Sequence, residues 1–161
     1  MVIIISKISC SSCGRIHERN YICNAKKKAK LDKSKKNRSR EDNKMFSTSR
    51  WKKLSNRIKE DYNNIDLFSY YILGKIEFSQ TVHHIVEFMQ DEDLMFDEDN
   101  LIPLNNYTHL SIVHKLYKTK CKGEIQDLLR DMISSWWNEE RELGSLRNKY
   151  NDIVREIGMN V

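Results

Sequence analysis

Hydrophobic residues recur at helical spacing over two stretches near the end of the chain. The first, 124–137, opens with acidic residues and then places apolar side chains at i, i+3, i+4, i+7, i+8, i+11 and i+12, which predicts an amphipathic helix. Its apolar positions are Ile125, Leu128, Leu129, Met132, Ile133, Trp136 and Trp137. A weaker repeat over 146–157 predicts a second helix. We expect this pair either to close the core or to bind a second copy of the chain.

A third amphipathic pattern covers residues 46–59. Its apolar positions recur at i, i+3 and i+7, at Trp51, Leu54 and Ile58. The hydroxyl residues at 47–49 supply an N-cap, so this segment is predicted to be a helix. The neighbouring stripe repeats the same spacing with three cations, Arg50, Lys53 and Arg57. These three cations should lie along one side of the helix.

Between these helices the chain alternates short segments of different kinds. Residues 62–73 are apolar and aromatic and fit neither the helical nor the strand period, and Gly74 ends them. Two strand-like stretches follow, at 75–78 and 81–88, and then an acidic loop at 90–99. An extended piece at 100–104 and a predicted helix at 107–117 complete this part of the chain. Helices mixed with a few short strands indicate an α+β fold.

The charge is distributed unevenly, which the formal net charge of +5 conceals. Residues 1–60 carry 18 Lys+Arg and 5 Asp+Glu, a net of +13, and residues 61–161 carry 10 and 18, a net of −8. Positive charge peaks over 26–40, where Leu31 is the only large apolar residue, so this segment should be a mobile arm or an exposed helix. Such asymmetry is typical of a polyanion partner, with a solvated linker as the alternative. The candidate phosphate contacts in this segment are Lys26, Lys27, Lys28, Lys30, Lys35, Lys36 and Arg38. The three cations of the helix predicted over 46–59 are candidate phosphate contacts as well.

The composition excludes several classes of protein. With 39% hydrophobic and 32% charged residues and one proline, the chain of 161 residues is neither collagen-like, nor wholly disordered, nor a disulfide-dense secreted protein. No apolar run approaches the roughly 20 residues of a membrane span. The aliphatic run at 2–5 has neither a basic residue before it nor a small-residue cleavage site after it. We therefore expect a cytoplasmic protein without a membrane partner.

Three of the four cysteines lie close together near the start of the chain. The sequence Cys10-Ser-Ser-Cys13-Gly is followed ten residues later by Cys23, and His17 is the nearest fourth ligand. In a reducing compartment this spacing fits either a separate structural zinc knuckle or free thiols. The fourth cysteine, Cys121, has no such neighbour in the sequence.

Three of the five histidines follow one another within 27 residues, in the order Val82-His83-His84-Ile85, Asn100-Leu-Ile-Pro-Leu104 and Thr108-His109. Adjacent residues of a regular strand point to opposite faces, so His83 and His84 can share a site only if the strand ends or bends there, or if a hydrogen bond turns one of the two rings. A neutral imidazole can bind a divalent metal or accept a proton from water, and phosphodiester hydrolysis can use both.

This ordered set resembles the HNH endonuclease family, especially its small phage-encoded members. Their pattern is a His/Asp-His pair closing one strand, an Asn-Leu-x-x-Leu strand and a helix with a further histidine, which together form a ββα-metal finger. The match covers about residues 45–118. Thr48-Ser49-Arg50-Trp51 stands where phage members often carry Ser-x-x-Trp. The resemblance implies an α+β chain with a ββα-metal (HNH) finger flanked by helices. Its parts would be a basic N-terminal arm with the cysteines (1–44), the nuclease core (45–120) and C-terminal helices (121–161).

Carried over by position, the resemblance implies a role for each residue of the set. His84 would be the general base that activates water, and Asn100 would pin the loop between the strands and orient His84. His83 and His109 would hold one divalent metal ion, Mg, Mn, Ni or Zn. The implied activity is metal-dependent cleavage of double-stranded DNA, in the host cytoplasm if the protein is phage-encoded. Its role would be either phage genome processing or packaging, beside phage terminase subunits, or that of a free-standing homing endonuclease. The alternative is a non-catalytic nucleic-acid-binding protein or regulator with a degenerate finger, which explains the basic segment equally well but not the ordered histidines.

The chain departs from the family pattern in two places. Many members brace the finger with a zinc ion held by two Cys-x-x-Cys pairs, and the equivalent positions here, Tyr70 and Leu73 with Asn105 and Thr108, hold no cysteine. We therefore expect no zinc beneath the finger, with 62–73 packing in its place. His114 lies five residues after His109, about 140° around an α-helix, so we expect it to lie outside the site. Glu87 and the acidic residues at 91–99 match no family ligand.

Overall fold

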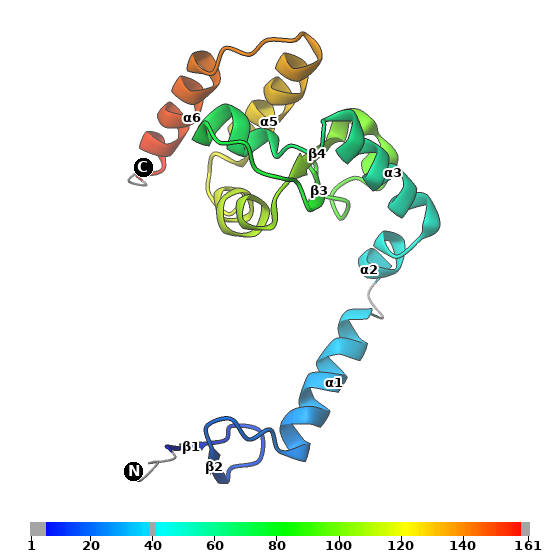
Figure 1. The fold of residues 1–161 in the computed structure, drawn as a ribbon, viewed down its shortest axis with the longest axis vertical. Coiled ribbons are helices and arrows are strands. Elements are labelled where there is room, and N and C mark those ends of the chain that lie inside the picture. The colour runs from blue at the N-terminus through cyan, green and yellow to red at the C-terminus, as the bar shows by residue number, and fades with distance from the viewer. Residues whose placement is uncertain (1–5, 39–40, 159–161) are drawn as a thin grey trace. The chain divides into compact units, whose positions relative to one another are not determined.

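The computed structural model describes residues 6–38 and 41–158, and for 34–38 and 41–43 it describes the backbone alone. The chain divides into two compact units, residues 1–47 and 48–161 (Figure 1). In the first unit, β1 (Lys7–Ser9) and β2 (Ile16–Glu18) form an antiparallel hairpin with Ile8 opposite His17. Two helices follow, α1 (Asn24–Arg38) and α2 (Glu41–Phe46).

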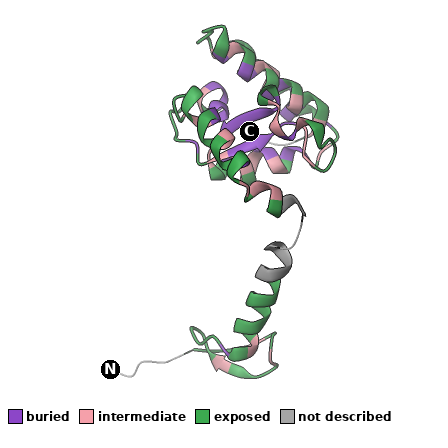
Figure 2. Ribbon diagram, turned by 90° about the vertical axis from the view of Figure 1, so that its right-hand side faces the viewer, coloured by how far each residue is buried: buried purple, intermediate pink, exposed green. Residues whose placement is uncertain are grey.

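The basic segment is an exposed helix, one of the two forms expected for it. From Lys26 to Lys33 every side chain of α1 is exposed (Figure 2). The helix therefore presents its lysines to solvent and buries no apolar face of its own over these residues. Within α1, the predicted phosphate contacts Lys35, Lys36 and Arg38 lie outside the residues whose side chains are described.

The second unit begins with α3 (Ser49–Asp61), the helix predicted over 46–59. Among the three candidate caps the structure selects Thr48, whose hydroxyl accepts a hydrogen bond of 3.2 Å from the Trp51 amide. Trp51 and Ile58 are buried, which confirms the predicted apolar stripe at its two ends.

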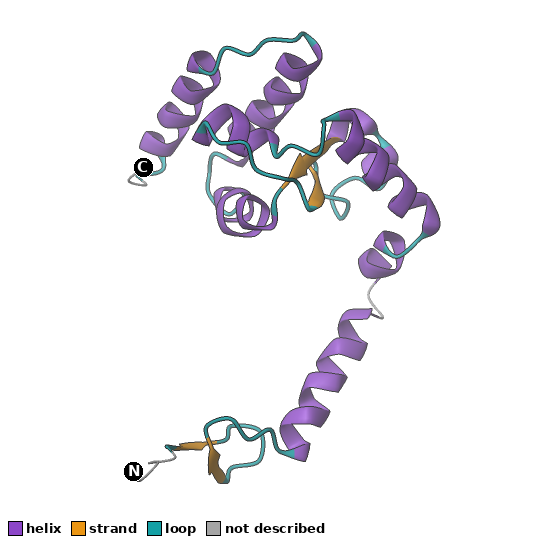
Figure 3. Cartoon of the chain, viewed as in Figure 1, coloured by secondary structure: helices purple, strands orange, loops and turns teal. Residues whose placement is uncertain are grey.

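Two short strands lie at the centre of this unit. β3 (Thr81–His84) pairs antiparallel with β4 (Leu101–Leu104), and every residue of the pair except Thr81 is buried (Figure 2). The connection between the strands contains two 3₁₀ turns, η2 (Asp93–Phe96) and η3 (Glu98–Asn100). After β4 the chain enters a π-type helix, η4 (Thr108–Val113), which continues directly as α4 (His114–Leu116). The element order is thus strand, strand, helix (Figure 3).

Helices surround these strands. α3 packs against both strands, and α5 (Lys122–Trp137) packs beside α6 (Gly144–Glu156), which also contacts the π-type helix η1 (Ser69–Leu73). All the predicted apolar positions of α5 except Trp137 are buried. Trp137 is 59% exposed at the end of the helix, where its indole N–H donates a hydrogen bond of 2.9 Å to the Tyr62 hydroxyl. The two C-terminal helices therefore help to close the core of the second unit.

The coarse prediction of an α+β fold is confirmed, while several of its details were wrong. Residues 75–78 form no strand, because only Phe78 makes an isolated bridge, to Ile65, and the side chains of Ile76 and Phe78 are 75% and 72% exposed. The strand predicted over 81–88 ends at His84, and the acidic loop contains the two 3₁₀ turns. No helix in the described part of the chain is long and apolar enough to span a membrane.

Candidate functional site

The two adjacent histidines of β3 point to opposite sides of the strand pair, as their alternation in a strand requires. His83 lies opposite Ile102 and faces the helix that follows β4, whereas His84 lies opposite Leu101 and meets Trp51 of α3. Both histidines are buried, with 4% and 7% of their surface exposed. The two imidazoles therefore have different neighbours, while β3 ends at His84, which is the condition under which both can serve one site.

The π-type helix η4 brings His109 and His114 together. The His114 amide donates to the His109 carbonyl, an i to i+5 hydrogen bond that takes one residue more per turn than an α-helix. As a result the two rings lie on the same side, with their Nε2 atoms 2.9 Å apart. The expectation that His114 points away from His109 was wrong, because it assumed 100° of rotation for every residue of a regular α-helix.

His83, His109 and His114 form a cluster of three imidazoles, which we call the histidine triad. Their potential ligand atoms all lie within 4.8 Å of one another. Two nitrogens bound to one zinc ion at about 2.1 Å each would be about 3.4 Å apart in a tetrahedral site, so this spacing fits a shared ion. The buried Nε2 atom of His83 has no hydrogen-bond partner among the residues described here. A buried polar atom without a partner is costly, and coordination of a metal ion would satisfy it.

The electrostatics of the triad favour neutral imidazoles. Burial, followed by the neighbouring histidines His109 and His114, holds the pKa of His83 well below its usual range. Burial and His114 likewise lower the pKa of His109 to about 4. Neutral imidazole is the form that coordinates a metal ion, so both residues are in the ligating state at neutral pH.

His84 has a different environment from the triad. Its ring stacks on Trp51, with centroids 4.8 Å apart and an interplanar angle of 19°, and its Nε2 lies 3.0 Å from the Met95 carbonyl. Because a carbonyl only accepts hydrogen bonds, Nε2 carries the proton, and the lone pair of the neutral ring is on Nδ1. Burial lowers the pKa of His84. The ring is thus a neutral base whose orientation is fixed by a stacking contact and a hydrogen bond.

Asn100 holds the loop between the strands at its two ends. Its Oδ1 accepts from the Val86 amide at 2.7 Å, and its Nδ2 donates to the carbonyls of Val86 and Leu94 at 3.1 and 3.2 Å. Leu94 precedes Met95, whose carbonyl accepts the hydrogen bond from His84. Asn100 therefore fixes the segment that orients His84.

Two of the four positions that correspond to zinc-binding cysteines in the family pattern, Asn105 and Thr108, belong to a hydrogen-bond network around a buried aspartate. Asp66 has no exposed surface, and its carboxylate accepts hydrogen bonds from the Ser69 amide and hydroxyl, the Asn105 amide and the Thr108 hydroxyl. These four bonds measure 2.7–3.1 Å. The network joins the N-terminus of η1 to that of η4, and η4 with its continuation α4 carries two histidines of the triad. This network was not predicted from the sequence. The only regularity in the sequence is that Asp66 and Ser69 are three residues apart, as are Asn105 and Thr108.

The three cations of α3 line one side of an open hollow, as their spacing predicted. Arg50, Lys53 and Arg57 surround a volume of about 350 Å³ together with Leu54, Phe96 and Glu98. The Arg50 guanidinium lies 3.8 Å from the centre of the Phe96 ring, and Arg57 forms an ion pair with Glu98. Phe96 follows Met95, so the hollow lies next to the segment that holds His84. Glu87, which has no counterpart in the family pattern, pairs with Lys122 at 2.7 Å and does not belong to the triad.

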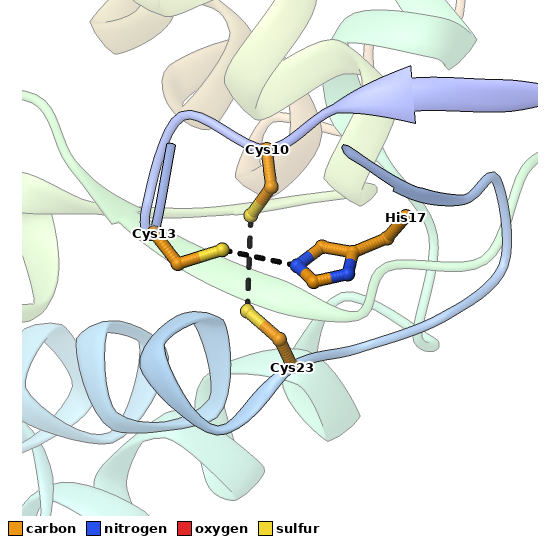
Figure 4. A group of neighbouring side chains, drawn as sticks. All are labelled: Cys10, Cys13, His17 and Cys23. Carbon is orange, nitrogen blue, oxygen red and sulfur yellow. Dashed lines mark hydrogen bonds between the residues drawn. The ribbon is translucent and has the colours of Figure 1, made fainter. Parts of the chain in front are cut away.

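The first unit contains a second cluster of potential metal ligands, which we call the Cys₃His cluster. Cys10, Cys13, His17 and Cys23 point toward one another, and their ligand atoms lie within 4.8 Å (Figure 4). Cys10 Sγ is 3.8 Å from Cys23 Sγ, and Cys13 Sγ is 3.0 Å from His17 Nε2. The amides of Ser12 and then Cys13 donate toward the Cys10 sulfur and lower its pKa to about 7. The four residues could bind a metal ion, while Cys121 is a separate buried thiol.

Comparison of the chain with protein-family models, with curated proteins and with solved structures found no match.

Proposed function

We propose that this protein is a metal-dependent endonuclease that hydrolyses phosphodiester bonds of double-stranded DNA, with an HNH-type ββα site. The convergence of His83, His109 and His114 within 4.8 Å carries the proposal. Three protein ligands leave further coordination positions for water and a substrate oxygen, as catalytic metal sites require. His84 on the same strand supplies a neutral imidazole for proton transfer, a combination that a purely structural metal site does not need.

In this proposal each residue has a distinct task. The triad holds one divalent ion, which supplies Lewis-acid stabilisation of charge on the phosphate and the leaving oxygen. His84 accepts the proton of the attacking water at Nδ1, while the Met95 carbonyl keeps Nε2 protonated and the ring oriented. Asn100 keeps the segment around Met95 in place. The cations of α1 and α3 bind the phosphate backbone without reading its sequence.

The rest of the interpretation depends on the HNH resemblance. Small phage proteins with this pattern act beside terminase in genome processing, and a role in packaging with terminase subunits as partners is the corresponding biological proposal.

The experiment that tests the activity is cleavage of supercoiled plasmid with Mg²⁺, Mn²⁺, Ni²⁺ or Zn²⁺, with and without a chelator. We expect cleavage only with metal, and we expect His84→Ala to lower its rate by at least about 10²-fold, the lower range for loss of a general base. Binding of the same DNA by His84→Ala should be unchanged. Unaltered cleavage by His84→Ala would remove this residue from the mechanism.

The triad is tested by His83→Ala and His114→Ala. Each should raise the metal concentration required for half-maximal cleavage by more than the roughly 10–100-fold typical of an outer-shell change. Leu110→Ala is the matched control, since Leu110 belongs to the same π-type helix and is 61% exposed. DNA binding without metal-dependent cleavage under any of these conditions would instead support the non-catalytic nucleic-acid-binding protein.

A further inference from the structure

Over the residues whose burial is described, the first unit has no apolar interior of the kind that normally stabilises a folded segment. Among its residues whose burial is described, Cys23 alone is buried, and Cys10, Cys13 and His17 are among the few that are half-buried. Several of its larger apolar side chains are exposed, including Ile16 at 69% and Tyr21 at 57%. A hairpin of two three-residue strands is not stable alone, and units of this size commonly need disulfides or metal ions. The least exposed side chains of the hairpin region are therefore the four potential ligands.

The geometry of the cluster fits zinc better than a disulfide. A disulfide requires its sulfurs about 2.05 Å apart, whereas Cys10 and Cys23 Sγ are separated by 3.8 Å. Two sulfurs bound to one zinc ion at about 2.3 Å each would be about 3.8 Å apart in a tetrahedral site. The backbone also forms a tight turn, since the Gly14 amide donates to the Cys10 carbonyl at 2.8 Å and Gly14 has φ of 70°. This turn places Cys10 and Cys13 on the same side.

Cys23 connects the cluster to α1. The Cys23 carbonyl accepts from the Lys27 amide at 2.9 Å, the first i to i+4 bond of the helix, and its sulfur lies 3.4 Å from the Lys26 amide. Side-chain acceptors at this position satisfy amides that a helix leaves without intrahelical partners. Fixing Cys23 on a metal ion would thus fix the first turn of α1.

The helix itself needs such support. Its first turn has no acidic residue, and the successive lysines from Lys26 repel one another and face the positive end of the helix dipole. A helix of 15 residues that buries no apolar face, as α1 does not from Lys26 to Lys33, is marginal in water. A Zn²⁺ ion with three thiolates and one neutral imidazole carries a net charge of about −1, which would oppose this concentration of positive charge.

We propose that Cys10, Cys13, His17 and Cys23 form a tetrahedral zinc site that organises the first unit and nucleates α1, so that the basic helix binds phosphate strongly only in the zinc-loaded protein. Zinc is thereby a regulator of the nucleic-acid interface, separate from the ion of the histidine triad. The effect of zinc on phosphate binding rests on the proposed function, whereas the zinc site and its effect on the helix do not.

Cobalt spectroscopy of the full chain tests the site. One equivalent of Co²⁺ added to the metal-free, reduced protein should produce thiolate-to-metal charge-transfer absorption and strong tetrahedral ligand-field bands, and Zn²⁺ should displace both. Cys10→Ser, Cys13→Ser and Cys23→Ser should each weaken these bands, while His17→Cys should retain a shifted thiolate spectrum. Cys121→Ser is the matched control and should keep the wild-type spectrum. The absence of thiolate bands in the wild-type protein would reject the site, because the histidine triad cannot produce them.

Hydrogen exchange tests the effect on α1. In the wild-type protein Zn²⁺ should slow amide exchange over residues 24–33, and in Cys23→Ser it should not. Equal exchange with and without Zn²⁺ would reject nucleation of the helix. Binding of a fluorescent DNA duplex, measured by anisotropy, should weaken when protection of the α1 amides is lost. Unchanged DNA affinity would reject the proposed effect of zinc on phosphate binding. Plasmid cleavage is scored separately, so a protein that never cuts DNA can still show the thiolate bands and the zinc-dependent protection.

Discussion

At the scale of single residues, Asp66 holds together segments that are distant in the sequence. Its carboxylate binds Asn105 and Thr108, which follow it by 39 and 42 residues. Hydrogen bonds to a charged acceptor are stronger than neutral ones, and loss of the acceptor leaves buried donors without partners. The position of η4, and with it two histidines of the triad, therefore depends on a single buried carboxylate.

We predict that Asp66→Asn lowers the free energy of unfolding by about 3 kcal/mol, because an amide offers fewer acceptor sites and turns its own N–H group toward the donors of Ser69 and Thr108. Urea unfolding followed by circular dichroism measures the change. Asp152→Asn provides the control, since Asp152 is an exposed residue of α6 paired with Arg155, and we expect a change within about 0.5 kcal/mol. Equal effects of the two substitutions would contradict the role assigned to Asp66.

The buried histidines predict a particular dependence of stability on pH. In the unfolded chain a histidine titrates near pH 6.5, whereas in the fold burial and His114 lower the pKa of His109 to about 4. Between these values the unfolded chain binds a proton that the folded protein excludes, so the metal-free protein loses stability as the pH falls through this window. Urea midpoints measured between about pH 7 and pH 4 should show this decline. His109→Gln should make it shallower, and an identical slope in wild type and variant would show that His109 does not contribute.

At the scale of elements, sequence periodicity anticipated the helices better than the site. Burial of Ile125, Leu128 and Leu129 follows directly from their 3.6-residue spacing, and the same is true of Trp51 and Ile58 in α3. Each of these helices buries one continuous stripe of side chains, and such a stripe produces a regular spacing of apolar residues in the sequence. That spacing was therefore sufficient to predict the helices.

The site depends on interactions that this periodicity does not record. His83, Asn100 and His109 were recognised from their order, but His114 enters the triad only because η4 winds with i to i+5 hydrogen bonds. That winding coincides with the Asp66 contacts to Asn105 and Thr108 at the start of the helix. Tertiary hydrogen bonds between segments far apart in the chain leave no periodic pattern, so a rule based on α-helical rotation misplaced His114.

We predict that deletion of Ser111 preserves the triad. The deletion would leave His109 and the former His114 four residues apart, about 40° around an α-helix, so a regular turn could replace the π-type turn. The metal concentration for half-maximal cleavage should stay within about tenfold of wild type, the size of a small outer-shell change. Insertion of one alanine at the same position is the opposite test, since it separates the histidines by six residues and should abolish cleavage. Loss of activity in a folded deletion variant, verified by near-ultraviolet circular dichroism, would contradict this account of η4.

At the scale of the whole molecule, the two compact units differ in charge as well as in structure. The first, residues 1–47, has 13 Lys+Arg and 4 Asp+Glu, a net of +9, and the second, residues 48–161, has 15 and 19, a net of −4. The histidine triad belongs to the negative unit, which also contains the cationic stripe of α3. Nucleic acid would therefore gain most of its electrostatic attraction from the first unit and meet the proposed catalytic groups in the second.

This division predicts how salt affects DNA binding. Each phosphate that a cation neutralises contributes about −0.9 to the slope of log K against log salt concentration. Replacement of Lys26, Lys27, Lys28 and Lys30 by glutamine should weaken binding to a non-specific duplex and reduce the magnitude of that slope by up to about 4. The same four positions changed to arginine keep their charge and should retain the slope, which separates the effect of charge from that of packing.

The four glutamine substitutions should also raise the DNA concentration needed for half-maximal cleavage. The rate at saturating DNA should stay unchanged, because these lysines belong to α1 and the triad belongs to the other unit. An unchanged salt slope would show that α1 does not contact the phosphate backbone, and a lower saturating rate would show that the basic helix also takes part in the cleavage step.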